Sequence, residues 1–234
     1  MIRWIAFDAD DTLWENEKYY HEGQRLLAEL LAPFQPAEVV DDTLLSNETA
    51  NLPWYGYGIK AFGISMIETA IQLSAGQVGS REVSQIIQHL RRMLAQPTEL
   101  LPGVLEVINE LQHNYQLMVI TKGDLLDQER KLTSSNLSGY FKAFEVVSNK
   151  VDHIYERILQ SYRIQSSEFM MVGNSLKSDV LPVVKLGGFG VYVPHQLTWA
   201  HEMVENPQTD SDRFVEIQSI RSLPDVLSKL NSKQ

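Results

Sequence analysis

The sequence has no cysteine among its 234 residues. Disulfide bonds, thiolate nucleophiles and thiolate metal sites are therefore excluded, and any bound metal must use oxygen or imidazole ligands. No uninterrupted apolar run is long enough to cross a bilayer. The first residues, 1–7, lead directly into an acidic cluster and lack the small-residue cleavage site of a targeting segment. We therefore expect a protein that folds in water, has no membrane partner and resides in the cytoplasm.

Positive charge is also scarce. The chain carries 20 Lys and Arg against 30 Asp and Glu, a formal net charge of -10. Because no basic stripe is present to neutralise backbone phosphates, nucleic acid is not expected as a partner. A small anionic substrate stays compatible with this charge, since one lysine and one cation can invert the field locally. Nothing in the sequence predicts an oligomeric state.

Short apolar runs predict the strands of a sheet. Most of them are continuous rather than alternating, as expected for parallel strands that are covered on both faces. Helical patterns separate the later runs, and strand and helix in alternation favour a doubly wound parallel sheet, an α/β Rossmann-like core. The predicted strands are 2–7, 116–120, 144–147, 169–172 and 189–193, and the predicted helices are 104–113, 125–136, 151–162 and 180–186.

The interval between the first two predicted strands is too long for a simple crossover connection. It contains no convincing strand, but several helical patterns that prolines and glycines interrupt. We therefore predict an α/β catalytic core at 1–14 and 98–234, with an inserted, mainly helical cap domain at 15–97. A polar stretch at 205–212 predicts a surface loop.

Polar residues follow the first four predicted strands at the points where those strands end. Because the carboxyl ends of parallel strands lie at one edge of a sheet, segments far apart in the sequence are expected to converge there. The set offers carboxylates, a hydroxyl, ammonium groups and further oxygen ligands, which meets the needs of phosphoryl transfer. The segments are DADDT at 8–12 (motif 1), TKGD at 121–124 (motif 2), Lys150 (motif 3) and GNSLKSD at 173–179 (motif 4).

These motifs resemble, in order and spacing, the four motifs of the haloacid dehalogenase superfamily. The helical insert is similar to the cap domain of that family in its position and helical character. The resemblance covers the core from end to end, and it implies a phosphatase-like branch of the family. An enzyme that hydrolyses a phosphate monoester is therefore expected.

The resemblance implies a role for each motif. Asp8 is expected to be the nucleophile, and Asp10 the general acid that protonates the leaving alkoxide and later takes a proton from water. Thr121 is expected to hydrogen-bond the phosphoryl group, with Gly123 allowing the backbone to approach closely. Lys150 is expected to neutralise phosphate and to hold Asp8 ionised.

Magnesium is the cofactor that the resemblance implies. Its expected ligands are oxygen atoms of Asp8, Asp10 (through the backbone carbonyl), Asn174 and Asp179, a set that suits a hard cation. The family commonly carries an acid where this chain has Asn174, so weaker metal binding is expected, and either Asn174 or Asp179 is the direct ligand. The six histidines show no paired metal-ligand spacing, and none is assigned to the site.

Residues beside the motifs have less specific expectations. Lys122 is expected to line the rim of the site and bind phosphate, Thr12 to shape the turn of motif 1, and Trp14 to pack. In the insert, the segment WYGYGIK at 54–60 has two interpretations. Either Tyr57 and Lys60 contact the substrate from a closing cap, or the segment is a corner between helices with buried aromatic residues.

The sequence thus favours a magnesium-dependent hydrolase of small phosphorylated metabolites that acts through an aspartyl phosphate. A phosphomutase would use the same acid and metal with a sugar hydroxyl in place of water. A 2-haloacid dehalogenase would need neither the metal nor Asp10, because halide leaves without a proton. A catalytically weak binding module is the third alternative, and Asn174 is the feature that supports it. The core motifs do not specify the physiological substrate.

Overall fold

A computed structural model of the chain describes residues 1–197, 199, 202 and 212–232. Its contacts divide the chain into two compact units. The α/β unit comprises Met1–Glu15, Thr98–Lys122 and Glu129–Gln234, and the helical unit comprises Asn16–Pro97 and Gly123–Gln128. None of the helices in the described part of the chain is both long and apolar enough to span a bilayer.

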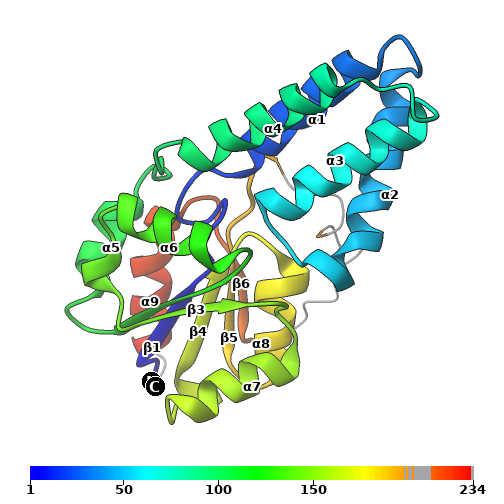
Figure 1. Cartoon of the computed structure of the whole chain (residues 1–234). Coiled ribbons are helices and arrows are strands. Elements are labelled where there is room, and N and C mark those ends of the chain that lie inside the picture. The colour runs from blue at the N-terminus through cyan, green and yellow to red at the C-terminus, as the bar shows by residue number, and fades with distance from the viewer. Residues whose placement is uncertain (198, 200–201, 203–211, 233–234) are drawn as a thin grey trace. The chain divides into compact units, whose positions relative to one another are not determined.

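The α/β unit is built on a six-stranded parallel sheet with the strand order β3-β2-β1-β4-β5-β6 (Figure 1). Phe7, the last residue of the first strand, pairs with Val119 on one side and Val172 on the other. The segments that follow these strands therefore start side by side, at the point where the strand order reverses. The strands are β1 (Trp4–Phe7), β2 (Gln116–Lys122), β3 (Ala143–Val147), β4 (Phe169–Gly173), β5 (Phe189–Tyr192) and β6 (Phe214–Glu216).

Both faces of this sheet are covered. Ile5 and Phe7 belong to one apolar cluster, which also includes residues of α5 and α9, whereas Ala6 belongs to another that includes residues of α7. This placement confirms the doubly wound α/β fold predicted from continuous apolar strands. The helices of the unit are α5 (Val104–Leu111), α6 (Leu125–Ser134, whose first turn groups with the helical unit), α7 (Asp152–Ser161), α8 (Leu181–Lys185) and α9 (Leu223–Ser232).

The structure differs from the predicted elements near the C-terminus. It adds β6 and α9, which the sequence analysis did not predict. The strand has only three residues, all partly or fully exposed, so it lacks the apolar run that marks a buried strand. The predicted helix at 180–186 is a short α-helix, α8, preceded by one π-helical turn at Leu176–Val180 that contains Asp179. The loop predicted at 205–212 lies outside the described residues except for Asp212.

The helical unit packs its own core. Leu27 and Leu31 from α1, Phe62 and Met66 from α3, and Ile86 from α4 are all almost fully buried. The helices are α1 (Glu17–Leu31), α2 (Ala37–Tyr55), α3 (Ile59–Leu73) and α4 (Ser80–Ala95).

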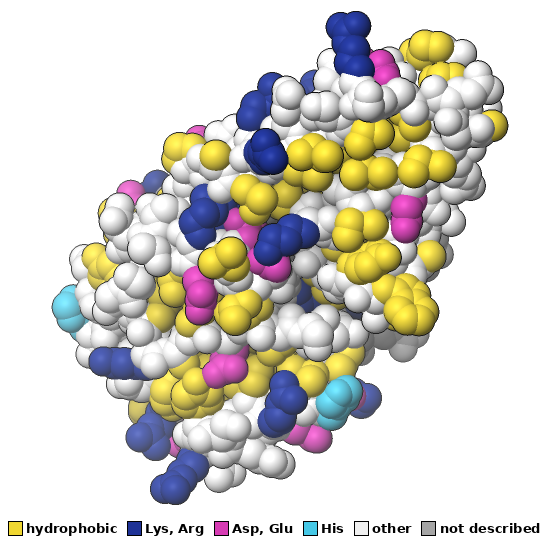
Figure 2. All heavy atoms as spheres, in the orientation of Figure 1, with side chains coloured by type: hydrophobic (Ala, Val, Ile, Leu, Met, Phe, Trp, Pro, Cys, Tyr) yellow, Lys and Arg dark blue, Asp and Glu magenta, His cyan; other side chains and the backbone are white. Residues whose placement is uncertain are grey.

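The corner between α2 and α3 contains the segment 54–60. Trp54 is 81% exposed and Tyr55 is 49% exposed, so the interpretation of this corner as one with buried aromatic residues is wrong for both. Figure 2 shows apolar side chains at the surface over α2 and α3. Aromatic side chains are large enough that only close packing from a neighbouring element buries them, and the sequence pattern of a corner does not reveal that packing.

Residues 123–128 group with the helical unit, although the sequence analysis assigned them to the core. Asp124 lies close to two residues of the helical unit, Gly58 and Lys60. A Cβ atom on Gly58 would lie 3.1 Å from the backbone nitrogen of Asp124, and the Lys60 ammonium lies 2.9 Å from Oδ1 of Asp124. Gly58 and Lys60 are distant from Asp124 in the sequence. The order of segments along the chain therefore does not reveal that they lie close together.

Candidate active site

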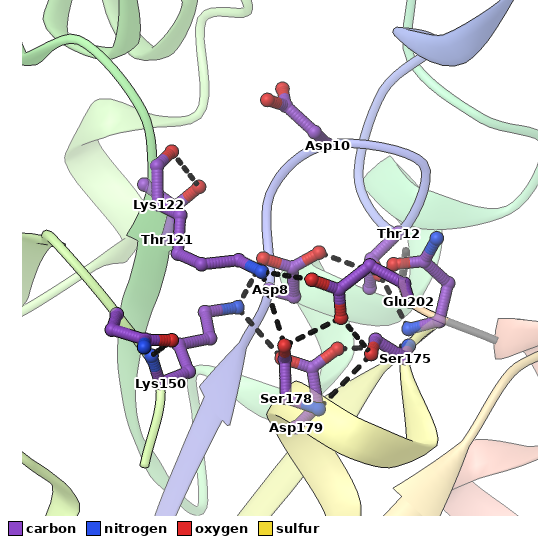
Figure 3. A network of polar contacts seen from close by, with 12 residues as sticks. Asp8, Asp10, Thr12, Thr121, Lys122, Lys150, Ser175, Ser178, Asp179 and Glu202 are labelled. Carbon is purple, nitrogen blue, oxygen red and sulfur yellow. Dashed lines mark hydrogen bonds and ion pairs between the residues drawn. The ribbon is translucent and has the colours of Figure 1, made fainter. Parts of the chain in front are cut away.

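Motifs 1, 3 and 4 meet through Lys150. Its ammonium group donates to Oδ1 of Asp8 and, at 2.7 Å, to Oδ1 of Asp179 (Figure 3). Asp8 directly follows β1, Lys150 follows β3, and Asp179 lies in the turn after β4. The side chains of Lys150 and Asp179 are each 1% exposed. The structure therefore brings these three predicted site residues into one buried ionic cluster.

Burial and charge act against each other in this cluster. Burial, reinforced by the nearby charge of Asp179, raises the pKa of Asp8 to about 7 despite the opposing effect of the Lys150 ammonium. Burial would lower the pKa of Lys150, but the carboxylates of Asp179 and Asp8 outweigh it and raise that pKa above its ordinary value. Lys150 is therefore charged at neutral pH, and Asp8 is sensitive to any further cation placed beside it.

Thr12 links motif 1 to motif 4. Its hydroxyl lies 3.4 Å from Oδ2 of Asp8 and 3.3 Å from Oδ1 of Asn174, and it accepts a hydrogen bond from the backbone nitrogen of Asn174 at 3.1 Å. The oxygen atoms of Asp8 and Asn174 therefore face the same hydroxyl group. The sequence predicted only a turn-shaping role for Thr12, since its contact with Asn174 spans 162 positions.

A second polar group forms around Lys122. The Lys122 ammonium contacts Oε1 of Glu202 and lies 3.1 Å from Oγ of Ser178. The other carboxylate oxygen of Glu202 accepts hydrogen bonds from the hydroxyls of Ser175 and Ser178, each at 2.5 Å. These hydroxyls belong to motif 4, so Lys122 and Glu202 connect motif 2 to motif 4 (Figure 3).

Glu202 was missed by the sequence analysis because it belongs to no motif. Burial alone would raise its pKa, but the charge of Lys122 and the hydrogen bonds from Lys122, Ser175 and Ser178 lower that pKa to about 2. Glu202 is therefore a carboxylate throughout the neutral range. No periodicity or spacing in the sequence marks this residue.

Asp10 lies apart from the ionic cluster of Asp8. Its Oδ1 atom accepts a hydrogen bond from Nε1 of Trp14 at 2.8 Å and another from the Lys131 ammonium at 3.0 Å. Figure 3 shows its carboxyl group directed away from Asp8. Trp14 was expected only to pack, and Lys131, on α6, was not singled out.

Motif 2 has one buried hydroxyl and one glycine. Thr121 is 1% exposed, and its hydroxyl lies 3.1 Å from the carbonyl oxygen of Lys122. Gly123 has a φ of +122°, a conformation that favours glycine, and a Cβ atom there would lie 2.9 Å from Nε2 of Gln128. Tyr57 and Lys60 belong to the helical unit, and their contact with a substrate stays a prediction.

A separate cluster of possible metal ligands includes Asp11 of motif 1. One ligand atom each from Asp11, Glu15 and His195 lies within 4.8 Å of the others. His195 Nδ1 is 3.7 Å from Asp11 and 2.8 Å from the carbonyl oxygen of Leu197, while Nε2 is 4.0 Å from Glu15. The two acids face opposite nitrogens of one ring, which is the arrangement of an imidazole bridging two carboxylates. None of the three residues is a predicted magnesium ligand.

The chain matches known proteins over most of its length. The family model described as haloacid dehalogenase-like hydrolase matches residues 2–187. The crystal structure of a haloacid dehalogenase-like family hydrolase from Xanthomonas campestris is 35% identical, with a TM-score of 0.88 over 99% of this chain and 93% of that chain. The pyrimidine 5'-nucleotidase YjjG of Escherichia coli K12 is 26% identical over 79% of this chain and 82% of that protein. A magnesium-bound structure of the putative HAD-hydrolase YfnB from Bacillus subtilis is 17% identical, with a TM-score of 0.67 over 97% of this chain and 98% of that chain.

The fold, the motifs and these matches agree on the class of protein. The chain belongs to the haloacid dehalogenase-like hydrolase family. The similar solved structures also include a 2-haloacid dehalogenase from Pseudomonas syringae, so membership in the family does not by itself select the substrate.

Proposed function

We propose that this protein is a magnesium-dependent phosphatase that hydrolyses small phosphate monoesters through a phosphoaspartate on Asp8. The observation that carries the proposal is the Lys150 ammonium bound between the carboxylates of Asp8 and Asp179. A buried lysine beside a buried carboxylate suits a nucleophile that must approach an anionic phosphoryl group. Relatives named as a pyrimidine 5'-nucleotidase and a glyceraldehyde 3-phosphate phosphatase support a phosphate substrate.

The proposed reaction has two steps. In the first, a carboxylate oxygen of Asp8 forms a bond to phosphorus while the ester P–O bond breaks, and the carboxyl group of Asp10 gives its proton to the leaving oxygen. In the second, water attacks the phosphorus, Asp10 takes a proton from that water, and the bond between phosphorus and Asp8 breaks. The products are an alcohol and inorganic phosphate, and both aspartates return to their starting states.

The cationic and hydroxyl groups of the site would bind the transferring phosphoryl group. Lys150, held by Asp8 and Asp179, would neutralise the charge of the phosphoryl group. The repulsion between that group and the attacking Asp8 carboxylate would therefore be smaller. Lys122, in motif 2, would bind a phosphoryl oxygen. Its ion pair with Glu202 would restrict the position of the Lys122 ammonium. Thr121 would donate a hydrogen bond from its buried hydroxyl.

The donor set fits magnesium. Asp8, Asn174 and Asp179 supply only oxygen atoms, and the oxygens of Asp8 and Asn174 face the same Thr12 hydroxyl. The backbone carbonyl of Asp10 would add a fourth ligand. When bound, the ion supplies positive charge that stabilises the developing charge on the phosphoryl oxygens. A cation beside Asp8 would also favour its carboxylate form, whose pKa burial raises to about 7. The description of the YfnB structure as magnesium-bound supports this choice.

Dehalogenation of a 2-haloacid is the second candidate, because dehalogenases are among the similar solved structures. The presence of Asp10, with its carboxyl group held by two hydrogen bonds, favours the phosphatase, since a departing halide needs no proton. Halide release from 2-chloropropionate, measured with and without magnesium, separates the candidates. Release of phosphate rather than of a phosphate isomer separates hydrolysis from a mutase reaction.

The direct test uses the purified protein with magnesium and 4-nitrophenyl phosphate. We expect phosphate release, and we expect Asp8→Asn to lower the turnover by at least about a thousandfold. The matched control is Asp41→Asn, an exposed residue of α2, which should keep the activity of the parent. Retained activity in Asp8→Asn would overturn the proposal.

A further inference from the structure

The Asp10 carboxyl group is held by two buried donors. Both the Trp14 indole nitrogen, at 2.8 Å, and the Lys131 ammonium, at 3.0 Å, contact the same oxygen, Oδ1. Trp14 is 0% exposed and Lys131 is 7% exposed, so neither donor is a mobile surface group. One carboxylate oxygen is therefore held by donors whose own positions are determined by packing.

The position of Lys131 is unusual for a helix. On α6, the buried residues Asp127 and Gln128 lie four and three positions before Lys131, on the same face of the helix. An ammonium group is costly to remove from water unless an anion accompanies it, and helices normally keep lysine at the surface. A break in this local rule is expected mainly at functional sites, and the Lys131 ammonium contacts Asp10 of motif 1.

The direction of Asp10 suits one specific task. In an in-line displacement, the leaving oxygen lies on the side of phosphorus opposite to the attacking oxygen. A group that protonates the leaving oxygen must therefore stand away from the nucleophile, and the Asp10 carboxyl is directed away from Asp8 (Figure 3). The like charge of Asp8 acts on an Asp10 carboxylate. The contacts with Trp14 and Lys131 fix the direction in which the Asp10 carboxyl group stands.

We propose that Lys131 and Trp14 are positioning residues that hold Asp10 where it delivers its proton to the leaving oxygen. This inference rests on the proposed phosphatase function and adds two residues to it. The proton moves from Asp10 to the ester oxygen as the P–O bond breaks, so the contribution of both residues depends on how strongly the leaving group needs that proton.

A leaving-group comparison tests this role. Phenyl phosphate releases a basic phenolate that needs protonation, whereas 2,4-dinitrophenyl phosphate releases an anion that departs without a proton. For Lys131→Met and Trp14→Phe, we expect kcat/KM for phenyl phosphate to fall about 10- to 100-fold, within the range of general acid catalysis, and kcat/KM for the dinitrophenyl ester to fall less than about threefold. Because kcat/KM reports on steps up to phosphoaspartate formation, slow hydrolysis of that intermediate does not mask the difference.

Two further variants complete the experiment. Lys131→Arg keeps a cation beside Asp10 and should recover part of the activity on phenyl phosphate, whereas Lys142→Met, which removes an exposed lysine, should leave both rates unchanged. Thermal unfolding of each variant verifies that it is folded, and Trp14→Phe provides the measurement if Lys131→Met does not fold. Equal losses on both esters would overturn the positioning role. An unmodified protein that hydrolyses neither ester would instead overturn the proposed function.

Discussion

The ammonium nitrogen of Lys150 lies 2.7 Å from Oδ1 of Asp179, and each of the two side chains is only 1% exposed. The same ammonium also contacts Asp8, so one buried cation forms ion pairs with two buried carboxylates. Removing one partner of a buried ion pair leaves an uncompensated charge, which costs more than the pair itself contributes. The ionic cluster is therefore a feature of stability as well as of the proposed chemistry.

Lys150→Met should strongly destabilise the protein at neutral pH. Loss of the buried cation should lower the free energy of unfolding by about 3 to 5 kcal/mol. Lys150 lowers the pKa of Asp8, which burial raises, so without Lys150 that pKa rises further and the folded protein binds more protons than the unfolded chain. The deficit should therefore shrink as the pH falls from 7.5 to 5. Urea unfolding at both pH values measures it, with the exposed Lys142→Met as the control. A deficit that grows towards pH 5 would contradict this account.

Glu202→Gln should change how the free energy of unfolding depends on pH. The pKa of Glu202 is about 2 in the folded protein against an ordinary value of 4.5, because Lys122 and the hydroxyls of Ser175 and Ser178 outweigh burial. A lowered folded-state pKa contributes stability that is complete above pH 4.5 and is lost as the pH falls towards 2. The substitution should lower the free energy of unfolding at pH 7 by up to about 3 kcal/mol.

The unfolding curves of this variant should also depend less on pH between 4.5 and 2 than those of the parent. Urea unfolding at a series of pH values from 7 downwards provides the comparison. Identical free energies of unfolding at pH 7, with identical slopes below pH 4.5, would show that the Glu202 contacts contribute no net stability.

Asn174→Asp should bind magnesium more tightly than the parent. The substitution adds a negative charge next to an oxygen set that already faces the Thr12 hydroxyl, and we expect the affinity to increase about tenfold. Without magnesium, the added charge should repel Asp8 and Asp179 and lower the midpoint of thermal unfolding. Calorimetric titration measures the affinity, and Asn109→Asp, on the exposed side of α5, is the control. An unchanged affinity would argue against Asn174 as a ligand.

Whether a strand could be predicted depends on whether its sequence contains an apolar run. The strands β1, β2, β3, β4 and β5 are marked by short apolar runs, because a strand covered on both faces must be apolar at nearly every position. The last strand, β6, has three residues at the edge of the sheet and lacks such a run. Edge strands need less burial, so their sequences resemble those of loops.

The site residues also differ in how far the sequence predicts them. Asp8, Lys150 and Asp179 each follow a predicted strand, so the common edge of a parallel sheet brings them together. Lys131 lies within α6 and Glu202 lies outside every motif, and both meet the site through contacts that span 121 and 80 positions. Contacts of this kind depend on how helices and loops pack, which local patterns do not encode.

The amino-acid order alone determined the doubly wound sheet, the helical insert and the convergence of motifs 1, 3 and 4, because apolar periodicity and strand direction are local properties of the chain. Only the tertiary structure decided which donors hold Asp10, which acid restrains Lys122 and which segment joins the helical unit. These choices arise from the packing of side chains distant in sequence, where burial makes an ammonium or a carboxylate depend on whichever opposite charge lies within reach.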